Sequence, residues 1–216
     1  PIRLMIDNDL VSSFILWGPP GTGKTTIAKI ISEITDSDFH QLNAVSAGVK
    51  EVRSVISAAK INKESFNQRT ILFIDEIHRF NKAQQDALLS AVESGLIILI
   101  GATTENPSFE VIPALRSRAR IYILEELTKK DLEDIITFAL KEDDFLKDLA
   151  IDSIDTDYLI YVSRGDARIL LNILESAVVQ QMNMEKIYIN KDDIDNVLQT
   201  KNVIYDKNGE QHYNII

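Results

Sequence analysis

The first 126 residues alternate short apolar runs, rich in β-branched and aromatic side chains, with stretches in which apolar residues recur every three or four positions. The short runs are typical of buried strands, and the longer pattern is typical of amphipathic helices. Five strands are expected, at residues 14–17, 39–42, 71–74, 97–101 and 121–124. Helices are expected between them, at residues 24–34, around 52–59, and from Asn81 to a stop at Gly95. This alternation predicts an α/β fold with a parallel sheet.

Beyond residue 126 helical periodicity replaces the strand pattern. Thr128 has the character of an N-cap, with Asp131 three residues later and a stripe of apolar residues after it. Further helices are expected around 158–162, at 167–181 and after Asn190. We therefore expect a small all-helical domain at residues 127–200, after an α/β domain at 1–126. Residues 201–216 form a polar tail that we expect to be a linker toward a further domain.

Composition narrows the class of protein. The 216 residues are 45% hydrophobic and 26% charged, which is typical of a globular chain. Because there is no cysteine, disulfides, thiolate zinc sites and cysteine nucleophiles are excluded. No apolar run is long enough to span a bilayer, and the first ten residues carry charges where a signal peptide would be apolar. We therefore expect a soluble, cytoplasmic protein with no membrane partner.

Charge is distributed unevenly along the chain, whose formal net charge is −10. Residues 1–126 carry 13 Lys and Arg against 15 Asp and Glu, whereas residues 127–216 carry 10 against 18. The overall charge argues against indiscriminate coating of nucleic acid. Any polyanion is therefore expected to bind to the first part of the chain.

The strongest motif follows the first expected strand. Residues 18–25 read Gly-Pro-Pro-Gly-Thr-Gly-Lys-Thr, which fits the phosphate-binding P-loop between a strand and a helix. In such a loop, backbone N–H groups and a helix N-terminus surround the phosphates. Lys24 is expected to neutralise phosphate oxygens and the Thr25 hydroxyl to bind Mg²⁺. The expected nucleotide contacts are Gly18, Pro19, Pro20, Gly21, Thr22, Gly23, Lys24, Thr25 and Thr26.

Two carboxylates end the expected strand at 71–74. Asp75 is interpreted as a carboxylate of the Mg²⁺ site, and Glu76 as the base that aligns the attacking water. The alternative is a solvated acidic strand end. His78 follows closely, but a single histidine at such a position favours a solvated or interface residue over a catalytic base.

Polar side chains also follow the next strand, and arginines precede the last one. Thr104 is the first candidate and Asn106 the second for a contact with the γ-phosphate or the water, although turn chemistry would also explain both. One arginine of the stretch 116–120 could act as an arginine finger that contacts the nucleotide of a neighbouring subunit. The alternative is a run of solvated charges. The arginines are Arg116, Arg118 and Arg120. Arg168, at a helix start in the second part, could reach the phosphates from a lid.

Three stretches carry a resemblance to a known family. They are residues 15–26, which contain the P-loop, residues 75–86 (DEIHRFNKAQQD) and residues 101–110 (GATTENPSFE). With these residues the chain resembles AAA+ ATPases of the clamp-loader clade over essentially its whole length. Most narrowly it resembles the replication-associated recombination protein A family and its Werner-helicase-interacting relatives. The stretch at 101–110 is the most specific of the three.

The resemblance implies a role for each matched residue. Thr104 would be sensor-1, Arg118 the arginine finger and Arg168 sensor-2, beside the two Walker motifs. Ala119 departs from the cysteine usual in clamp loaders, a change outside the arginine itself. The resemblance also implies a P-loop AAA+ domain at 1–126 whose N-terminal part is missing and a helical lid at 127–200. The linker at 201–216 would lead to a C-terminal oligomerisation domain.

The function implied is ATP hydrolysis, with Mg²⁺, by a factor that acts at stalled replication forks during replication, recombination and repair. Its partners would be single-stranded or forked DNA, further copies of itself, and single-stranded-DNA-binding protein or other replisome proteins; in a bacterium it would be associated with the nucleoid. The alternatives are a clamp loader, a motor like those of Holliday junctions, or a protein-remodelling ATPase. An ATP-gated scaffold and a small-molecule kinase are weaker alternatives.

Overall fold

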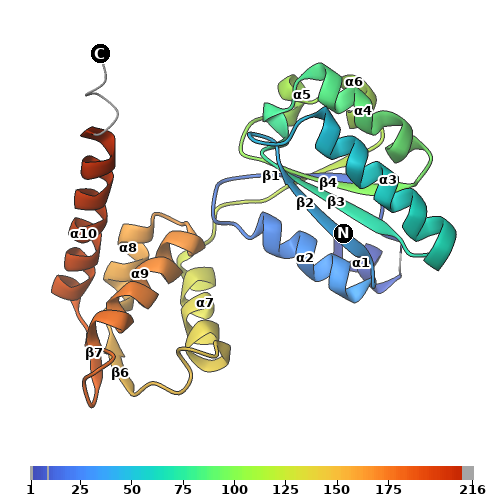
Figure 1. The fold of residues 1–216 in the computed structure, drawn as a ribbon. Helices are drawn as coiled ribbons and strands as arrows, with labels where there is room; N and C mark the ends of the chain where they lie inside the picture. Colours follow the sequence, from blue (N-terminus) through green and yellow to red (C-terminus); the bar gives the residue numbers. More distant parts are fainter. Residues whose placement is uncertain (1, 9, 211–216) are drawn as a thin grey trace. The chain divides into compact units, whose positions relative to one another are not determined.

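The computed structural model describes residues 2–8 and 10–210. It divides between Glu125 and Glu126 into two compact units, each described here by itself (Figure 1). None of the helices among the described residues has both the length and the apolar character needed to cross a membrane.

The first unit is built on a parallel sheet of five strands in the order β2-β3-β4-β1-β5. The strands are β1 (Phe14–Trp17), β2 (Asp38–Asn43), β3 (Thr70–Asp75), β4 (Ile97–Thr103) and β5 (Arg120–Ile123). Each lies within two residues of its predicted ends, and the α/β fold class is confirmed.

Helices cover both faces of this sheet (Figure 1). They are α1 (Ile2–Asp7), α2 (Lys24–Ile34), α3 (Val49–Phe66), η1 (Ile77–Arg79), α4 (Lys82–Glu93), α5 (Pro107–Glu110) and α6 (Pro113–Arg116). On one face α1 and α2 pack against one apolar cluster, and on the other α3 and α4 pack against a second. In β3, Ile71 and Phe73 belong to the first cluster, whereas Leu72 and Ile74 belong to the second. A strand that is buried on both faces is thus continuously apolar, as its sequence is.

The second unit is not all-helical. Its helices are α7 (Lys129–Glu142), α8 (Thr156–Ser163), α9 (Ala167–Gln181) and α10 (Lys191–Glu210), but β6 (Ile151–Ile154) and β7 (Ile187–Ile189) form a two-stranded parallel sheet. The expectation of an all-helical lid was therefore wrong in this respect. Two helices separate the strands in the sequence, and each strand is too short for its periodicity to be recognised.

Helix α10 extends to Glu210 and so includes ten residues of the segment that we expected to be a linker. No proline interrupts residues 191–210, so nothing in the backbone chemistry ends the helix at Thr200. The last part of that expected linker, residues 211–216, lies outside the described residues.

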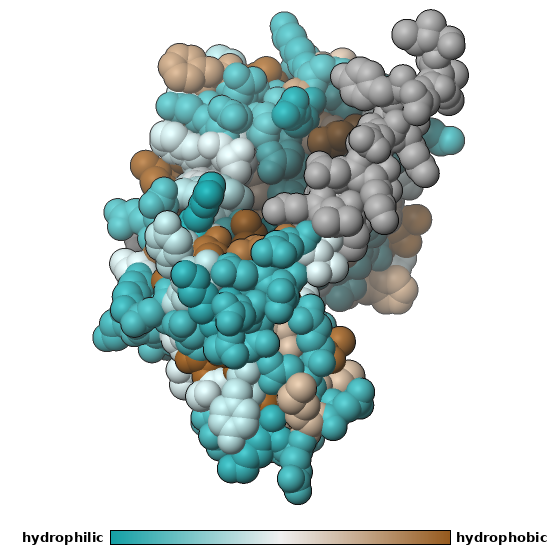
Figure 2. Space-filling view, turned by 90° about the vertical axis from the view of Figure 1, so that its left-hand side faces the viewer, coloured by the Kyte–Doolittle hydropathy of each residue, from teal (hydrophilic) through white to brown (hydrophobic). Residues whose placement is uncertain are grey.

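The face of the molecule drawn in Figure 2 is largely hydrophilic, in keeping with the excess of acidic residues.

Candidate active site

Parallel pairing brings the predicted site residues to one edge of the sheet. Trp17, at the end of β1, lies opposite Thr103, at the end of β4, and Ile74 of β3 lies opposite Gly101 of β4. The loop that begins at Gly18 therefore lies at the same edge as Asp75. The carboxyl edge of a parallel sheet is where ligands bind in open α/β folds.

The loop begins with a glycine that no larger residue could replace without movement. The Gly18 N–H donates to the Thr103 carbonyl over 3.2 Å, and the Leu124 N–H donates to the Trp17 carbonyl over 2.7 Å. A Cβ built on Gly18 would lie 2.3 Å from the Leu124 carbonyl oxygen. The loop thus leaves the sheet in close contact with the chain just beyond β5.

Two further glycines shape the loop where it enters α2. Gly21 and Gly23 have φ angles of 71° and 82°, in the left-handed region that favours glycine. Gly23 is the N-cap of α2, so the helix starts at the loop and directs its unpaired N–H groups toward it. Because a helix N-terminus attracts anions, this geometry suits a phosphate group.

Lys24 supplies a cation inside the loop. The residue is 9% exposed, and its Nζ donates to the carbonyl oxygens of Gly18 and Pro19 over 2.8 and 2.6 Å. A largely buried ammonium requires such oxygen partners. The positive charge is thereby held beside the backbone that would surround a phosphate.

The two carboxylates leave β3 through a sharp change of direction. Asp75 is half-buried at the end of the strand, whereas Glu76 has φ 55° and ψ 44°, an uncommon left-handed conformation for a residue with a side chain. Strain of this kind is concentrated at functional sites. The turn ends the strict alternation of side chains along a strand, as expected for two groups that serve one phosphate.

His78 was expected to be a solvated or interface residue, and the structure rules out the solvated alternative. Its side chain is 9% exposed, and its Nδ1 lies 3.0 Å from Thr103 Oγ1 and 3.3 Å from Glu76 Oε2. The local sequence could not reveal the contact because it joins η1 to the end of a strand 25 residues later.

Sequence reasoning also passed over Thr103. Its side chain is buried and contacts His78, whereas Thr104, the predicted sensor-1, is exposed directly after β4. Asn106 acts as a helix cap: its Oδ1 accepts the Ser108 N–H over 2.9 Å at the start of α5. That bond favours turn chemistry for Asn106, while the role of Thr104 stays a prediction.

The donors available to a metal ion fit Mg²⁺. Thr25 is half-buried in the first turn of α2 and Asp75 ends β3, so both offer hard oxygen ligands. Among the described residues, no group of three or more acidic, histidine or cysteine side chains could hold a metal alone. Mg²⁺ commonly uses one or two protein oxygens together with substrate phosphates and water.

The candidate arginines differ in their surroundings. The Arg118 guanidinium contacts the Glu93 carboxylate at 2.5 Å and donates to the Ala114 carbonyl over 2.8 Å, while its side chain stays 39% exposed. Arg116 is half-buried, and Arg120 is exposed at the start of β5. Arg168 is exposed in the second unit, so its predicted role as sensor-2 stays a prediction.

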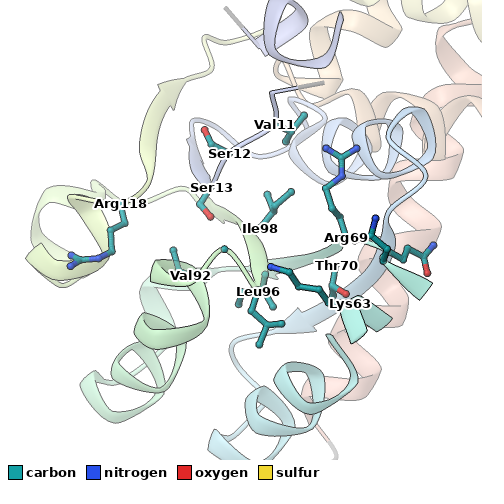
Figure 3. A pocket seen from close by; sticks show the side chains of 14 residues that line it. Val11, Ser12, Ser13, Lys63, Arg69, Thr70, Val92, Leu96, Ile98 and Arg118 are labelled. Carbon is teal, nitrogen blue, oxygen red and sulfur yellow. The ribbon is translucent and has the colours of Figure 1, made fainter. Parts of the chain in front are cut away.

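A cavity of about 390 Å³ lies at the opposite, amino-terminal edge of the sheet (Figure 3). It is bordered by Ser13 before β1, by Thr70 at the start of β3 and by Ile97 at the start of β4. Arg118 also lines it, but the guanidinium points away from Ser13 and Thr70. The cavity is therefore separate from the P-loop, which follows the carboxyl end of β1.

Comparison with known proteins agrees with the site. Residues 14–127 match the family described as "ATPase family associated with various cellular activities (AAA)", and residues 146–216 match "AAA C-terminal domain". The chain belongs to the AAA family of ATPases. This confirms the expectation of an ATPase that was based on the P-loop and the strand ending in Asp75 and Glu76.

Relatives of this AAA chain confirm the narrower resemblance. It is 42% identical to the ATPase WRNIP1 of Dictyostelium discoideum, with 100% of this chain and 27% of that protein covered. It is 41% identical to replication-associated recombination protein A of Haemophilus influenzae, with 100% of this chain and 49% of that protein covered. The chain thus spans half or less of the length of these relatives.

A solved structure has a similar fold. The Thermotoga maritima RuvB Holliday junction branch migration motor matches with a TM-score of 0.69 and 29% identity, over 92% of this chain and 65% of that one.

Proposed function

We propose that this AAA chain hydrolyses ATP to drive work on DNA in replication-associated recombination, as the names of its relatives imply for them. The observation that carries the ATPase part is the meeting of three sequence segments at one sheet edge. These are the P-loop after β1, the carboxylates after β3 and the threonines at the end of β4. The DNA part is supported by the similarity to recombination proteins and to a branch migration motor.

Each residue of the candidate site has its own proposed role in hydrolysis. Loop N–H groups and Lys24 bind the β- and γ-phosphates, and Glu76 accepts a proton from the attacking water. The water oxygen bonds to the γ-phosphorus while the bond to the bridging β–γ oxygen breaks, which releases ADP and inorganic phosphate. Thr25 and Asp75 would hold Mg²⁺, which when bound neutralises charge on the phosphates. Thr104 would contact the γ-phosphate or the water.

Arg118 is proposed to act on the nucleotide of a neighbouring copy. It precedes β5, whose first residue, Arg120, lies opposite Phe14 at the start of β1. The P-loop instead follows Trp17 at the other end of β1, about 10 Å along the strands at 3.3 Å per residue. The arginine and the loop thus lie toward opposite edges of one sheet, which favours a role in trans. Arg168 is proposed to contact the nucleotide from the second unit.

Further copies of the protein are therefore proposed partners, together with single-stranded or forked DNA. Single-stranded-DNA-binding protein and other replisome proteins are proposed on the relatives' association with replication alone. Action at stalled forks and a location in the cytoplasm, or at the nucleoid of a bacterium, belong to the same proposal.

The test is the ATP turnover of the full-length protein, measured without DNA and with matched single-stranded, duplex, forked and four-way-junction DNA. We expect turnover to rise with DNA and to rise most with single-stranded or forked DNA. Strongest stimulation by the four-way junction would instead favour a branch migration motor. No stimulation by any DNA would contradict the DNA part and favour a protein-remodelling ATPase.

A further inference from the structure

His78 is placed between two groups of the candidate site. Its Nδ1 lies 3.0 Å from the Thr103 hydroxyl oxygen and 3.3 Å from a Glu76 carboxylate oxygen. The imidazole is almost fully enclosed, with 9% of the side chain exposed, whereas 35% of the Glu76 side chain is exposed. A buried ring therefore contacts the more exposed group that is proposed to accept the proton of water.

The neighbouring hydrogen bonds assign the proton on the imidazole. Thr103 Oγ1 accepts the Glu105 N–H over 2.9 Å and donates its own proton to the Glu105 carbonyl over 3.1 Å. The hydroxyl then has only a lone pair left for His78. Since the nearby Glu76 carboxylate oxygen is also an acceptor, we assign the proton to Nδ1, which donates it to Thr103 Oγ1 and lies 3.3 Å from that oxygen.

We propose that His78 is a positioning residue that holds the Glu76 carboxylate in its productive orientation and ties it to the end of β4. Glu76 leaves β3 in a left-handed conformation and opens η1, so its carboxylate is not oriented by the regular sheet. The polar edge of the ring, with Nδ1 3.3 Å from the Glu76 carboxylate oxygen, attracts and orients that group. The ring itself is held by its hydrogen bond to Thr103 at the end of the central strand. The inference rests on the proposed role of Glu76 as the base.

The test compares His78→Phe, which keeps a planar ring without the donor, with His78→Asn, whose amide can occupy the position of Nδ1. A displacement of about 1 Å at a reacting group can cost about 10²-fold in rate. We expect His78→Phe to lower kcat by about that factor with ATP affinity unchanged, and His78→Asn to restore most of the loss. Arg79→Ala, at the exposed neighbouring position, is the matched control and should leave kcat unchanged.

A second measurement separates positioning from packing. In a Glu76→Gln background, His78→Phe should change the residual turnover less than twofold, because the carboxylate that it orients is already absent. If His78→Phe fails to fold, Thr103→Val removes the other contact while it preserves the shape of the side chain, and kcat should again fall with ATP affinity unchanged.

The outcomes distinguish this inference from the proposed function. Wild-type turnover in Glu76→Gln would show that the base is misassigned. Loss of turnover in Glu76→Gln, together with wild-type kcat in both His78→Phe and Thr103→Val, would overturn the positioning role alone. Equal losses in His78→Phe and His78→Asn, or a full additional loss in the Glu76→Gln background, would also overturn it.

Discussion

Two glycines of the P-loop are required for different physical reasons. Gly18 faces the Leu124 carbonyl so closely that a methyl group cannot fit, whereas Gly23 has open space around it but a φ of 82°. The first constraint comes from another part of the chain and the second from the local backbone. A glycine motif read from the sequence does not separate these two causes.

We predict that Gly18→Ala lowers the free energy of unfolding more than Gly23→Ala. The Gly23 substitution introduces left-handed strain of about 1–2 kcal/mol. The Gly18 substitution must instead displace backbone between β1 and β5, because the contact would be 2.3 Å. Urea denaturation of both variants measures the difference. A Gly18→Ala variant as stable as the wild type would contradict the close approach seen here.

At this scale the sequence predicted the residues that belong to a local motif. Lys24, Asp75 and Glu76 were predicted from the residues beside them, and their roles stay predictions. His78 and Thr103 were not, since their contact depends on β3 and β4 lying next to each other. Burial of a polar side chain by a distant strand leaves no signal in the local pattern.

At the scale of elements, the cap of α7 shows how a predicted helix start is stabilised. The Thr128 hydroxyl and backbone N–H both donate to one Asp131 carboxylate oxygen, over 2.6 and 2.8 Å. These bonds, first from the side chain and then from the backbone of Thr128, lower the pKa of Asp131. The capping pair that the sequence predicted is thus present.

The lowered pKa of Asp131 predicts a dependence of stability on pH. A carboxyl group whose pKa is lower in the folded state contributes its stabilisation above the unfolded-state pKa, about 3.9. That contribution is lost as the pH falls through the folded-state pKa. Asp131→Asn should therefore destabilise α7 at pH 7 and make little difference in strong acid. Thermal unfolding of the variant and the wild type at several pH values measures this effect. Asp134→Asn, at an exposed position of the same helix, is the control. An equal effect of Asp131→Asn at every pH would contradict the prediction.

Elements were predictable where they are long or fully buried. Strands β1, β3 and β4 are largely apolar runs that are buried on both faces. The edge strands β2 and β5 keep exposed positions and were expected from the alternation of strands with helices. Strands β6 and β7 have only four and three residues. Each has exposed residues between its apolar ends. Their pairing depends on the packing of α8 and α9, so the sequence pattern alone indicated a helical bundle.

At the scale of the whole molecule, the proposed arginine finger makes ATP turnover depend on the assembly of several copies of the protein. An arginine finger contributes about 10³ to 10⁵ in kcat in related nucleotide hydrolases. We predict that Arg118→Ala in the full-length oligomer removes most turnover and leaves ATP affinity within a few fold. The measurements are steady-state turnover and equilibrium binding of ATP.

Mixing experiments decide whether the arginine acts in trans. Oligomers that contain both Arg118→Ala and Glu76→Gln subunits should regain part of the activity, because some interfaces then pair an intact Glu76 with an intact Arg118. Arg116→Ala and Arg120→Ala are the matched controls. Arg118 would be the wrong residue under two joint results. Oligomers of Arg118→Ala and Glu76→Gln subunits form but stay inactive at every ratio, and mixtures of Glu76→Gln with Arg116→Ala or Arg120→Ala regain activity.

The most direct test of the proposed site is single-turnover hydrolysis of ATP by Glu76→Gln under saturating protein, with binding measured in parallel. Loss of a general base typically costs about 10² to 10⁴ in rate. We predict ATP affinity within a few fold of wild type and hydrolysis slower by at least about 10²-fold, whereas Lys24→Ala should lose binding itself. Hydrolysis of bound ATP at the wild-type rate by Glu76→Gln would contradict the assignment of the carboxyl edge of β3 as the catalytic site.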